Sequence, residues 1–191
     1  FSPASFLMSI FTLCRRAIFS LSAALLLVLT GCSGSSDGPP YEPEEAVTTF
    51  EVADGFRVEL FASEPLFRDP VAMAVDEQGR IYVAEDPGYQ ELNSGLGQIS
   101  VLTDTDGDGY PDESTVFADG LDSPRGLQPW KGGLIVTEAP EVYYFKDTNG
   151  DNVADEKEVW MTGFGNSNPQ LGVNSPIYGL DNWIYLAHRY S

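Results

Sequence analysis

The chain has 191 residues, of which 29 are acidic and 10 are basic, and its formal net charge is −19 at pH 7. This composition argues against nucleic-acid binding, because contacts with phosphates need Lys and Arg side chains. A strongly acidic surface instead suits the binding of metal cations and an exported, soluble domain.

Residues 1–31 are predicted to be upstream residues followed by a helical lipoprotein signal peptide. Arg15 and Arg16 form a positive segment, and a short apolar run follows over residues 17–29. The residues that end at Cys32 resemble a bacterial lipobox, where cleavage precedes a Cys that becomes acylated. The alternative is a transmembrane anchor, although about 13 apolar residues are short for spanning a bilayer. We therefore expect export and a lipid anchor on Cys32, at the outer membrane or the periplasmic face.

Residues 32–48 are predicted to be a flexible tether, because Gly and Pro recur there among Ser and acidic residues. Cleavage would remove Cys14 and lipid would occupy Cys32, so no cysteine would remain for a disulfide. The folded domain is therefore expected over residues 49–191.

A segment of this domain is repeated at an offset of 43 residues. Residues 103–121 and 146–164 are identical at 8 of 19 positions. A period of 40–50 residues in strand-forming sequence is typical of a β-propeller blade. In addition, Pro70, Pro124 and Pro176 each begin an apolar strand, which is followed by a polar turn and a second strand.

The repeat predicts an all-β fold of four-stranded antiparallel propeller blades. About two and a half blades are expected, in a chain that is an N-terminal fragment of a longer protein. An earlier strand is predicted over residues 56–61, where it would close the ring by joining the last blade. The innermost blade strands are predicted at about 71–76, 125–130 and 175–180, and the second strands at about 80–85, 133–139 and 183–188. The third strands are predicted at about 98–103 and 142–146, and the outer strands at about 114–119 and 157–162.

Two loops between third and outer strands have the D-x-[DN]-x-D spacing of calcium sites. Calcium takes 6–8 oxygen ligands, and Asn152 can replace the turn Gly because Asn enters the left-handed region. The alternative for each loop is a solvated acidic turn. A bound ion would be structural, because these loops are expected at the end away from the active site. The candidate ligands are Asp104, Asp106, Asp108, the Tyr110 carbonyl and Asp112 in the first loop, and Asp147, Asn149, Asp151, the Val153 carbonyl, Asp155 and Glu158 in the second.

Three polar residues occupy equivalent positions at the ends of the second strands, namely Glu85, Glu138 and His188. Blade symmetry would place them around one end of the ring, where they could serve acid–base chemistry or bind a polar ligand. The alternative is that they are polar strand ends in water.

The loops expected at that same end span residues 86–97, 122–125 and 165–174. They offer groups that could bind a sugar or a quinone by hydrogen bonds and ring stacking, although turn formation and packing explain the same residue types. The candidate ligand-binding residues are Tyr89, Arg125, Asn168, Gln170 and Asn174.

Several stretches resemble the bacterial membrane-bound dehydrogenase propellers, which are related to the soluble glucose/sorbosone dehydrogenases. The resemblance implies quinone-dependent oxidation of a sugar or alcohol, with pyrroloquinoline quinone and calcium as cofactors. It also implies further C-terminal domains that commonly include cytochrome c, so haem would lie outside this fragment. The resembling stretches are residues 54–65, 69–76, 103–109, 116–121 and 173–185.

One position departs from the pattern of these relatives. Where they often have a His before Val173-Asn174, this chain has Leu171-Gly172, and Leu171 cannot act as a general base. Either the base lies elsewhere, for example at His188 or beyond Ser191, or the protein does not oxidise alcohols. The alternative hypothesis is therefore a non-catalytic cell-surface propeller that binds carbohydrate or protein.

Overall fold

The computed structural model describes residues 38–89, 91, 94–168 and 171–188, and it divides the chain into two compact units, 1–48 and 49–191. The first unit contains a short helix, α2 (Pro43–Val47), within the segment predicted to be a tether. Pro43 and two glutamates begin this helix, where both residue types are favourable. The predicted signal peptide and Cys32 lie outside the described residues. Among the described helices, none is long and apolar enough to cross a membrane.

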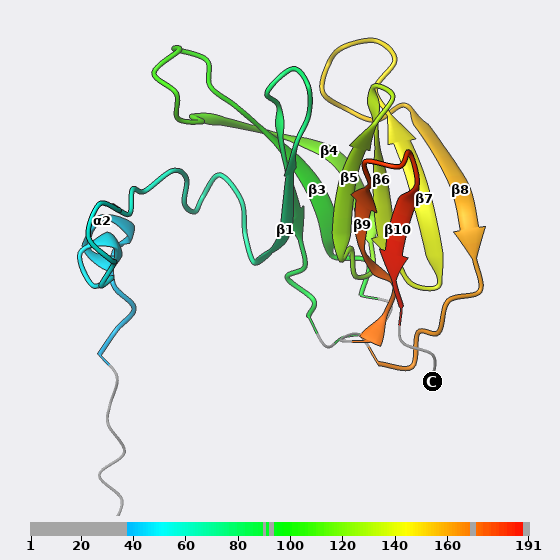
Figure 1. Cartoon of the computed structure of the whole chain (residues 1–191), viewed down its shortest axis with the longest axis horizontal. Helices are drawn as coiled ribbons and strands as arrows, with labels where there is room; N and C mark the ends of the chain where they lie inside the picture. Colours follow the sequence, from blue (N-terminus) through cyan, green and yellow to red (C-terminus); the bar gives the residue numbers. More distant parts are fainter. Residues whose placement is uncertain (1–37, 90, 92–93, 169–170, 189–191) are drawn as a thin grey trace, which may run out of the picture. The chain divides into compact units, whose positions relative to one another are not determined.

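The second unit is all-β (Figure 1). Each of its two four-stranded antiparallel sheets keeps the strands in chain order, and a hairpin follows them. The first sheet comprises β1 (Pro70–Val75), β2 (Ile81–Glu85), β3 (Gly97–Thr103) and β4 (Glu113–Leu121); the second comprises β5 (Gly126–Trp130), β6 (Gly133–Glu138), β7 (Glu141–Lys146) and β8 (Glu156–Thr162); the hairpin pairs β9 (Asn174–Tyr178) with β10 (Ile184–Ala187).

The predicted strands of the repeated sheets are confirmed, and their ends differ from the observed ones by no more than a few residues. The prediction of a strand over residues 56–61 was wrong, because this segment forms no strand. A strand needs a neighbour for its ladder of hydrogen bonds, and the described residues offer this segment none. Phe56 accordingly remains 76% exposed.

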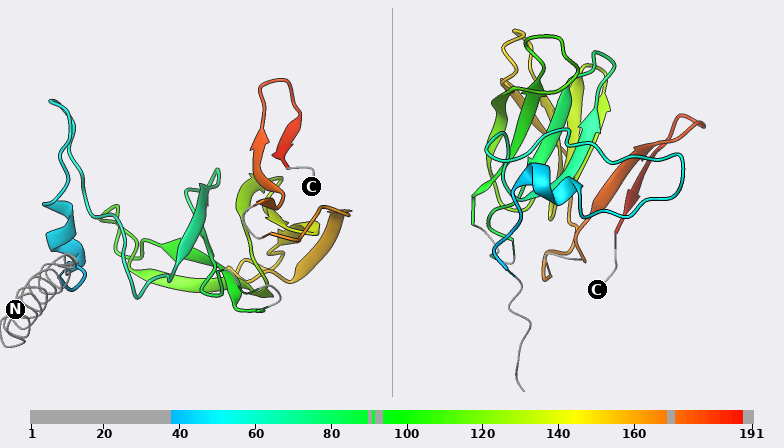
Figure 2. Two further views of the ribbon diagram at one scale, coloured as in Figure 1. Left: turned by 90° about the horizontal axis from the view of Figure 1, so that it is seen from below. Right: turned by 90° about the vertical axis from the view of Figure 1, so that its left-hand side faces the viewer.

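The apolar core lies between successive layers, which Figure 2 shows one after another. Between the two sheets, Tyr82 and Phe117 from the first pack with Leu134 and Phe145 from the second. The rings of Tyr82 and Phe117 meet edge to face, with centroids 5.2 Å apart. A second cluster joins the second sheet to the hairpin, and it contains Ile135, Val142 and Val173 with Ile184 and Leu186. The first strands of successive layers, β1, β5 and β9, therefore lie next to one another.

Two polar contacts tie the second acidic loop to the first sheet. The backbone N–H of Ala154 donates to the carbonyl of Phe117 in β4, at 2.8 Å, and so joins the loop to the backbone of the neighbouring sheet. The Arg80 guanidinium pairs with Asp76 at 2.7 Å and lies 4.0 Å from the carboxylate of Asp147. The loop over residues 147–155 is therefore part of the contact between the sheets.

The two kinds of loop lie at opposite ends of the sheets, as predicted. The acidic loops are at the upper end in Figure 1, and the loops that follow β2, β4 and β8 are at the lower end. At the lower end the N–H of Gly95 donates to the carboxylate of Asp122, at 3.0 Å. Gly126 lies so close to Asn174 and Pro176 that a Cβ atom there would come within 3 Å of both. Three segments far apart in the sequence thus meet at one end.

Candidate functional site

Glu85 and Glu138 are buried at the ends of β2 and β6, and they have the same structural role. The Glu85 carboxylate accepts the backbone N–H of Arg68 at 2.7 Å, just before β1 begins. The Glu138 carboxylate accepts the N–H of Asp122 at 2.5 Å, just before β5 begins. Hydrogen bonds from an N–H group to a charged carboxylate are among the stronger ones in proteins. Each glutamate therefore fixes the chain where it enters its own sheet.

The remaining carboxylate oxygens of the two glutamates differ. In Glu85, Oε1 accepts hydrogen bonds from the Ser100 hydroxyl and from the Gln98 side chain. In Glu138, Oε2 is buried and has no hydrogen-bond partner. Burial raises the pKa of the Glu138 carboxyl, while the N–H of Asp122 acts in the opposite direction.

His188 follows β10 and is exposed. Its ring meets that of Phe164 edge to face, with centroids 5.2 Å apart. None of the hydrogen bonds, ion pairs and ring contacts found among the described residues joins His188, Glu85 and Glu138 to one another. The described structure therefore does not gather these three residues, which symmetry suggested as an acid–base set, into one cluster.

Tyr89 and Arg125, two of the predicted ligand-binding residues, do lie together. The centre of the Arg125 guanidinium is 5.1 Å from the centroid of the Tyr89 ring, which is a cation–π distance. Beneath them lies Asp86, whose fully buried carboxylate is 3.3 Å from Arg125. The Ser123 hydroxyl donates to the same carboxylate oxygen, at 2.9 Å. Tyr89 thus lies over a cation that a buried anion holds in place.

Asp86 is a residue of this cluster that the sequence did not single out. It directly follows Glu85 in an acidic chain, and only its burial and its pairing with Arg125 distinguish it. Asp86 Oδ1 and two nitrogen atoms of Arg125, Nε and Nη2, are buried without a hydrogen-bond partner. Because buried polar groups are normally paired, these atoms indicate a place where water or a polar ligand group belongs.

The loop that carries Tyr89 is held by short-range contacts. The N–H of Asp86 donates to the Asp69 carbonyl, and the N–H of Tyr89 donates to the Asp86 carbonyl, both at 3.1 Å. Gly88 lies so close to Ser94 that a Cβ atom would come within 2.4 Å of the Ser94 hydroxyl oxygen. Only glycine allows the loop to fold this tightly against itself.

Two shallow hollows flank this cluster. One, of about 380 Å³, is lined by Tyr89, Asp86 and Asp69 together with Pro70, Val71 and Pro87. The other, of about 360 Å³, includes Arg125, Asn174 and Val71 in its lining. Val71 lines both hollows, so Tyr89, Arg125 and Asn174 border one continuous region.

The structure describes one of the other two predicted ligand-binding residues, Asn168. Asn168 is exposed, and its carbonyl accepts the N–H of Leu171 at 3.0 Å in a turn. Gln170 lies outside the described residues.

At the opposite end, the two acidic loops form the same hydrogen bonds. The Asp104 carboxylate accepts the N–H groups of Gly107 and Gly109 at 2.6 and 2.8 Å, and Asp147 accepts the equivalent groups 43 residues later. These N–H groups, that of Gly109 first, hold the pKa of Asp104 below its usual range, so the carboxylate is charged at neutral pH. Asp104, Asp106 and Asp108 each offer an oxygen within 4.8 Å of the others.

The prediction that Asn152 can replace the turn glycine is confirmed. Asn152 has a φ of 65°, and its counterpart Gly109 has a φ of 94°. Both values lie in the left-handed region, which Asn enters more readily than most residues.

Among the other predicted ligands, Asp112 and Asp155 occupy equivalent positions in the two loops, whereas Glu158 lies apart from the second loop. Asp112 accepts hydrogen bonds from Thr105, and Asp155 accepts them from Thr148. Glu158, the predicted last ligand of the second loop, lies in β8, where its carboxylate accepts the indole N–H of Trp160 at 3.1 Å. At the remaining ligand positions, a backbone N–H donates to the side-chain oxygen of the residue two positions earlier. The donor and acceptor residues are Asp108 and Asp106, Tyr110 and Asp108, Asp151 and Asn149, and Val153 and Asp151.

The buried carboxyl of Glu138 leads to a prediction about pH. A carboxyl whose pKa is raised on folding destabilises the folded state as the pH rises from its unfolded pKa, about 4.3, through its folded pKa. Glu138→Gln keeps an acceptor for the N–H of Asp122 and removes the charge. We expect the variant and the parent to differ least near pH 4, with the variant becoming relatively more stable toward pH 7.

Urea unfolding at a series of pH values measures this difference. Glu77→Gln, at an exposed turn position, serves as the control and should show no such trend. A stability difference for Glu138→Gln that stays constant between pH 4 and pH 7 would contradict the prediction.

Comparison with known proteins identifies a family. A protein-family profile described as a domain of unknown function, DUF7133, matches residues 42–191. No curated protein and no solved structure matches the chain. Because the match covers all the described sheets and most of the chain, the protein belongs to the DUF7133 family.

Proposed function

We propose that the repeated sheets are blades of a β-propeller. The support is that both sheets run in chain order from β1 or β5 outward, and that the first strands of successive layers are neighbours. A propeller arranges four-stranded sheets around a central channel in this manner. The loops that carry Tyr89, Arg125 and Asn174 would then surround one mouth of the channel.

We further propose that this mouth binds a carbohydrate without converting it. The observation that carries the proposal is the ring of Tyr89, which is 42% exposed and lies over the guanidinium that buried Asp86 holds. An exposed aromatic ring in a fixed orientation offers an apolar face to a sugar ring. Asp69, Arg125 and Asn174 lie at the edges of the same region and would meet hydroxyl groups.

The partners of the candidate catalytic residues favour binding over catalysis. Each oxygen of Glu85 already accepts at least one hydrogen bond, and His188 contacts Phe164 rather than the Tyr89 region. Leu171 stands near the place where the dehydrogenases that the chain resembles often have a histidine. A general base must reach the proton that it removes, and the contacts of Glu85 and His188 make both less available for this role, whereas Glu138 keeps Oε2 without a hydrogen-bond partner.

Quinone-dependent oxidation of a sugar or alcohol is the second candidate. The order of the resembling stretches favours it, as does the buried Nε of Arg125, which has no hydrogen-bond partner and could donate to an anionic cofactor. However, the described residues of this end do not fit pyrroloquinoline quinone, which carries three carboxylates. Arg125 is already paired with Asp86, and Asp69 and Asp122 add negative charge nearby. Dye reduction with added quinone and calcium would support this candidate over simple binding.

The carbohydrate proposal predicts a specific loss of affinity in Tyr89→Ala. An aromatic contact of this kind contributes about 0.5–1.5 kcal/mol, so we expect binding to weaken by about 2- to 10-fold. The full-length chain would be screened on a glycan array, and the affinity for bound sugars measured by calorimetry. Tyr110→Ala is the matched control, because Tyr110 is 41% exposed at the opposite end. Absence of any sugar binding, or equal affinity in Tyr89→Ala, would contradict the proposal.

We also propose that calcium binds the first acidic loop and has a structural role. The donor set fits this ion, because Asp104, Asp106 and Asp108 gather hard oxygen atoms and calcium prefers such ligands. In the second loop, Arg80 lies beside Asp147 and supplies positive charge there. The first loop has the greater need of a cation, since like charges repel at this distance.

Chelation should therefore lower the melting temperature. Binding at a hundredfold excess over Kd stabilises the folded state by about 2.7 kcal/mol, which corresponds to roughly 5–10 °C in a domain of this size. Asp106→Asn combined with Asp108→Asn should remove most of this difference. The control is Asp54→Asn combined with Asp119→Asn, which changes two exposed carboxylates elsewhere. If chelator leaves the parent's melting temperature unchanged, the loops are acidic turns without a metal.

Finally, we propose that the protein is exported and anchored by lipid on Cys32. The support is that two arginines, an apolar run and lipobox-like residues follow one another over residues 15–32. Ser33, rather than Asp, follows the cysteine and favours the outer membrane of a Gram-negative host.

Cys32→Ser should release the protein from membranes or block processing of the signal. Cell fractionation and mass measurement after expression with the native signal would follow both effects. Cys14→Ser changes the other cysteine of the chain and should leave anchoring intact. Membrane association that persists in Cys32→Ser would indicate a transmembrane anchor instead.

A further inference from the structure

Successive layers follow one another in the same way at the end that carries Tyr89. Each junction has two comparable positions, the residue after one layer's second strand and the residue before the next layer's first strand. Between the two sheets these residues are Asp86, which follows β2, and Arg125, which precedes β5. Between the second sheet and the hairpin they are Ala139, which follows β6, and Val173, which precedes β9. Asp86 therefore corresponds to Ala139, and Arg125 corresponds to Val173.

The fold does not depend on charge at such a junction. Val173 is fully buried in the apolar cluster between the second sheet and the hairpin, and Ala139 packs against the same cluster. At the first junction the corresponding side chains are charged, although those of Asp86 and Arg125 are only 0% and 12% exposed. A buried ion pair is often no more stabilising than apolar residues of similar volume. The charged pair therefore points to a role other than stability.

The pair keeps one hydrogen-bond acceptor and one donor unused. Oδ1 of Asp86 and Nε of Arg125 are both buried without a hydrogen-bond partner, while Ser123 donates to the other carboxylate oxygen of Asp86. Both residues also border surface hollows. Asp86 lines the hollow of about 380 Å³ that Tyr89 borders, and Arg125 lines the one of about 360 Å³. A ligand group that reaches the pair from these hollows must donate to Asp86 and accept from Arg125.

This requirement selects the chemistry of the ligand. A carboxylate or phosphate group could accept from Arg125, but Asp86 and the nearby Asp69 would repel it. An ammonium group could donate to Asp86, but it offers no acceptor to Arg125. Two adjacent hydroxyl groups satisfy both residues, because a hydroxyl group can donate as well as accept. Uncharged sugars carry such pairs of hydroxyl groups.

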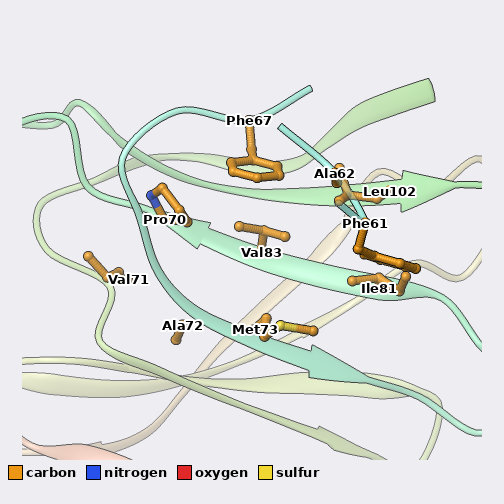
Figure 3. A pocket seen from close by; sticks show the side chains of 10 residues that line it. All are labelled: Phe61, Ala62, Phe67, Pro70, Val71, Ala72, Met73, Ile81, Val83 and Leu102. Carbon is orange, nitrogen blue, oxygen red and sulfur yellow. The ribbon is translucent and has the colours of Figure 1, made fainter. Parts of the chain in front are cut away.

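The larger hollow of the first sheet imposes no such requirement. It has a volume of about 420 Å³, and apolar side chains alone line it, among them Phe61 and Phe67 (Figure 3). Its lining includes Ile81 and Val83, the neighbours of Tyr82 in β2, so it lies on the face opposite the one that packs against the second sheet. It offers no polar side chain that could distinguish one sugar from another.

We therefore infer that the region beside Tyr89 selects an uncharged sugar, and that two adjacent hydroxyl groups of this sugar bind Asp86 Oδ1 and Arg125 Nε. The inference rests on the proposed carbohydrate binding, and it adds the class of sugar and the atoms that recognise it. Tyr89 contributes affinity for a sugar ring of any kind. Asp86 and Arg125 determine the specificity, because each would keep an unpaired buried atom when the wrong ligand binds.

Transfer of the second junction onto the first tests the inference. Asp86→Ala combined with Arg125→Val installs the corresponding residues Ala139 and Val173 in the full-length chain and leaves the net charge unchanged. Calorimetry measures the binding of methyl glucoside, methyl galactoside and methyl mannoside. A hydrogen bond to a charged group contributes about 10- to 100-fold to affinity, so the grafted variant should bind the preferred glycoside at least about tenfold more weakly. Its midpoint of urea unfolding should stay close to that of the parent.

Arg125→Lys separates the two roles of the pair. Lysine keeps a cation beside Asp86 but lacks the Nε donor, so stability should be retained while sugar affinity falls. The control is Arg57→Val combined with Glu59→Ala, which removes an exposed ion pair of 2.8 Å and should bind sugar like the parent. A deoxy glycoside that lacks one of the two hydroxyl groups should bind the parent about tenfold more weakly, and the grafted variant should not distinguish it from the complete sugar.

Three results overturn the inference. Glucuronate or galacturonate that binds the parent as tightly as the uncharged glycosides contradicts the selection by charge. If Arg125→Lys and the grafted variant keep the parent's affinity while Tyr89→Ala loses it, the carbohydrate proposal stands and the pair is structural, with water on its buried atoms. If the grafted variant does not fold, the affinity of Arg125→Lys decides. A parent that binds no sugar overturns the carbohydrate proposal and this inference together.

Discussion

The structure depends on one constraint, which is that each sheet is apolar on both faces. All six residues of β6 are buried, with Leu134 and Val136 directed toward the first sheet and Ile135 toward the hairpin. Burying a large apolar side chain stabilises the fold by about 1.5–3 kcal/mol, so leaving either face in water is unfavourable. A single sheet of this kind cannot satisfy both faces, and the layers must therefore stack.

Stacking also creates the candidate binding region. Asp86 follows β2 and Arg125 precedes β5, and they meet because the two sheets bring these ends together. A buried ion pair often contributes little net stability, since both charges lose their hydration. Its role here is to fix a geometry, because Arg125 is held where Tyr89 lies over it. At the opposite end, each acidic loop forms its own network of hydrogen bonds, and the second loop also contacts the first sheet.

Structural features that depend on residues close together in the chain could be predicted from the sequence. Apolar runs separated by polar turns placed the strands, and the 43-residue repeat identified two loops that do form equivalent hydrogen bonds. The left-handed conformation of Asn152 followed from the intrinsic preference of asparagine. The strand over residues 56–61 was predicted wrongly, because an apolar pattern does not show whether a pairing neighbour exists.

The roles of the acidic side chains at the strand ends were decided by tertiary structure. Glu85 and Glu138 bind backbone N–H groups of Arg68 and Asp122, and a backbone group leaves no mark in the pattern of side chains. Asp86 resembled any other acid of the chain until burial and Arg125 distinguished it. Thus the sequence by itself determined the strands, the repeat and the two acidic loops, because these depend on residues close together in the chain. Only the tertiary structure decided which face is covered and which carboxylate is paired, because packing and desolvation act between residues that are distant in the sequence.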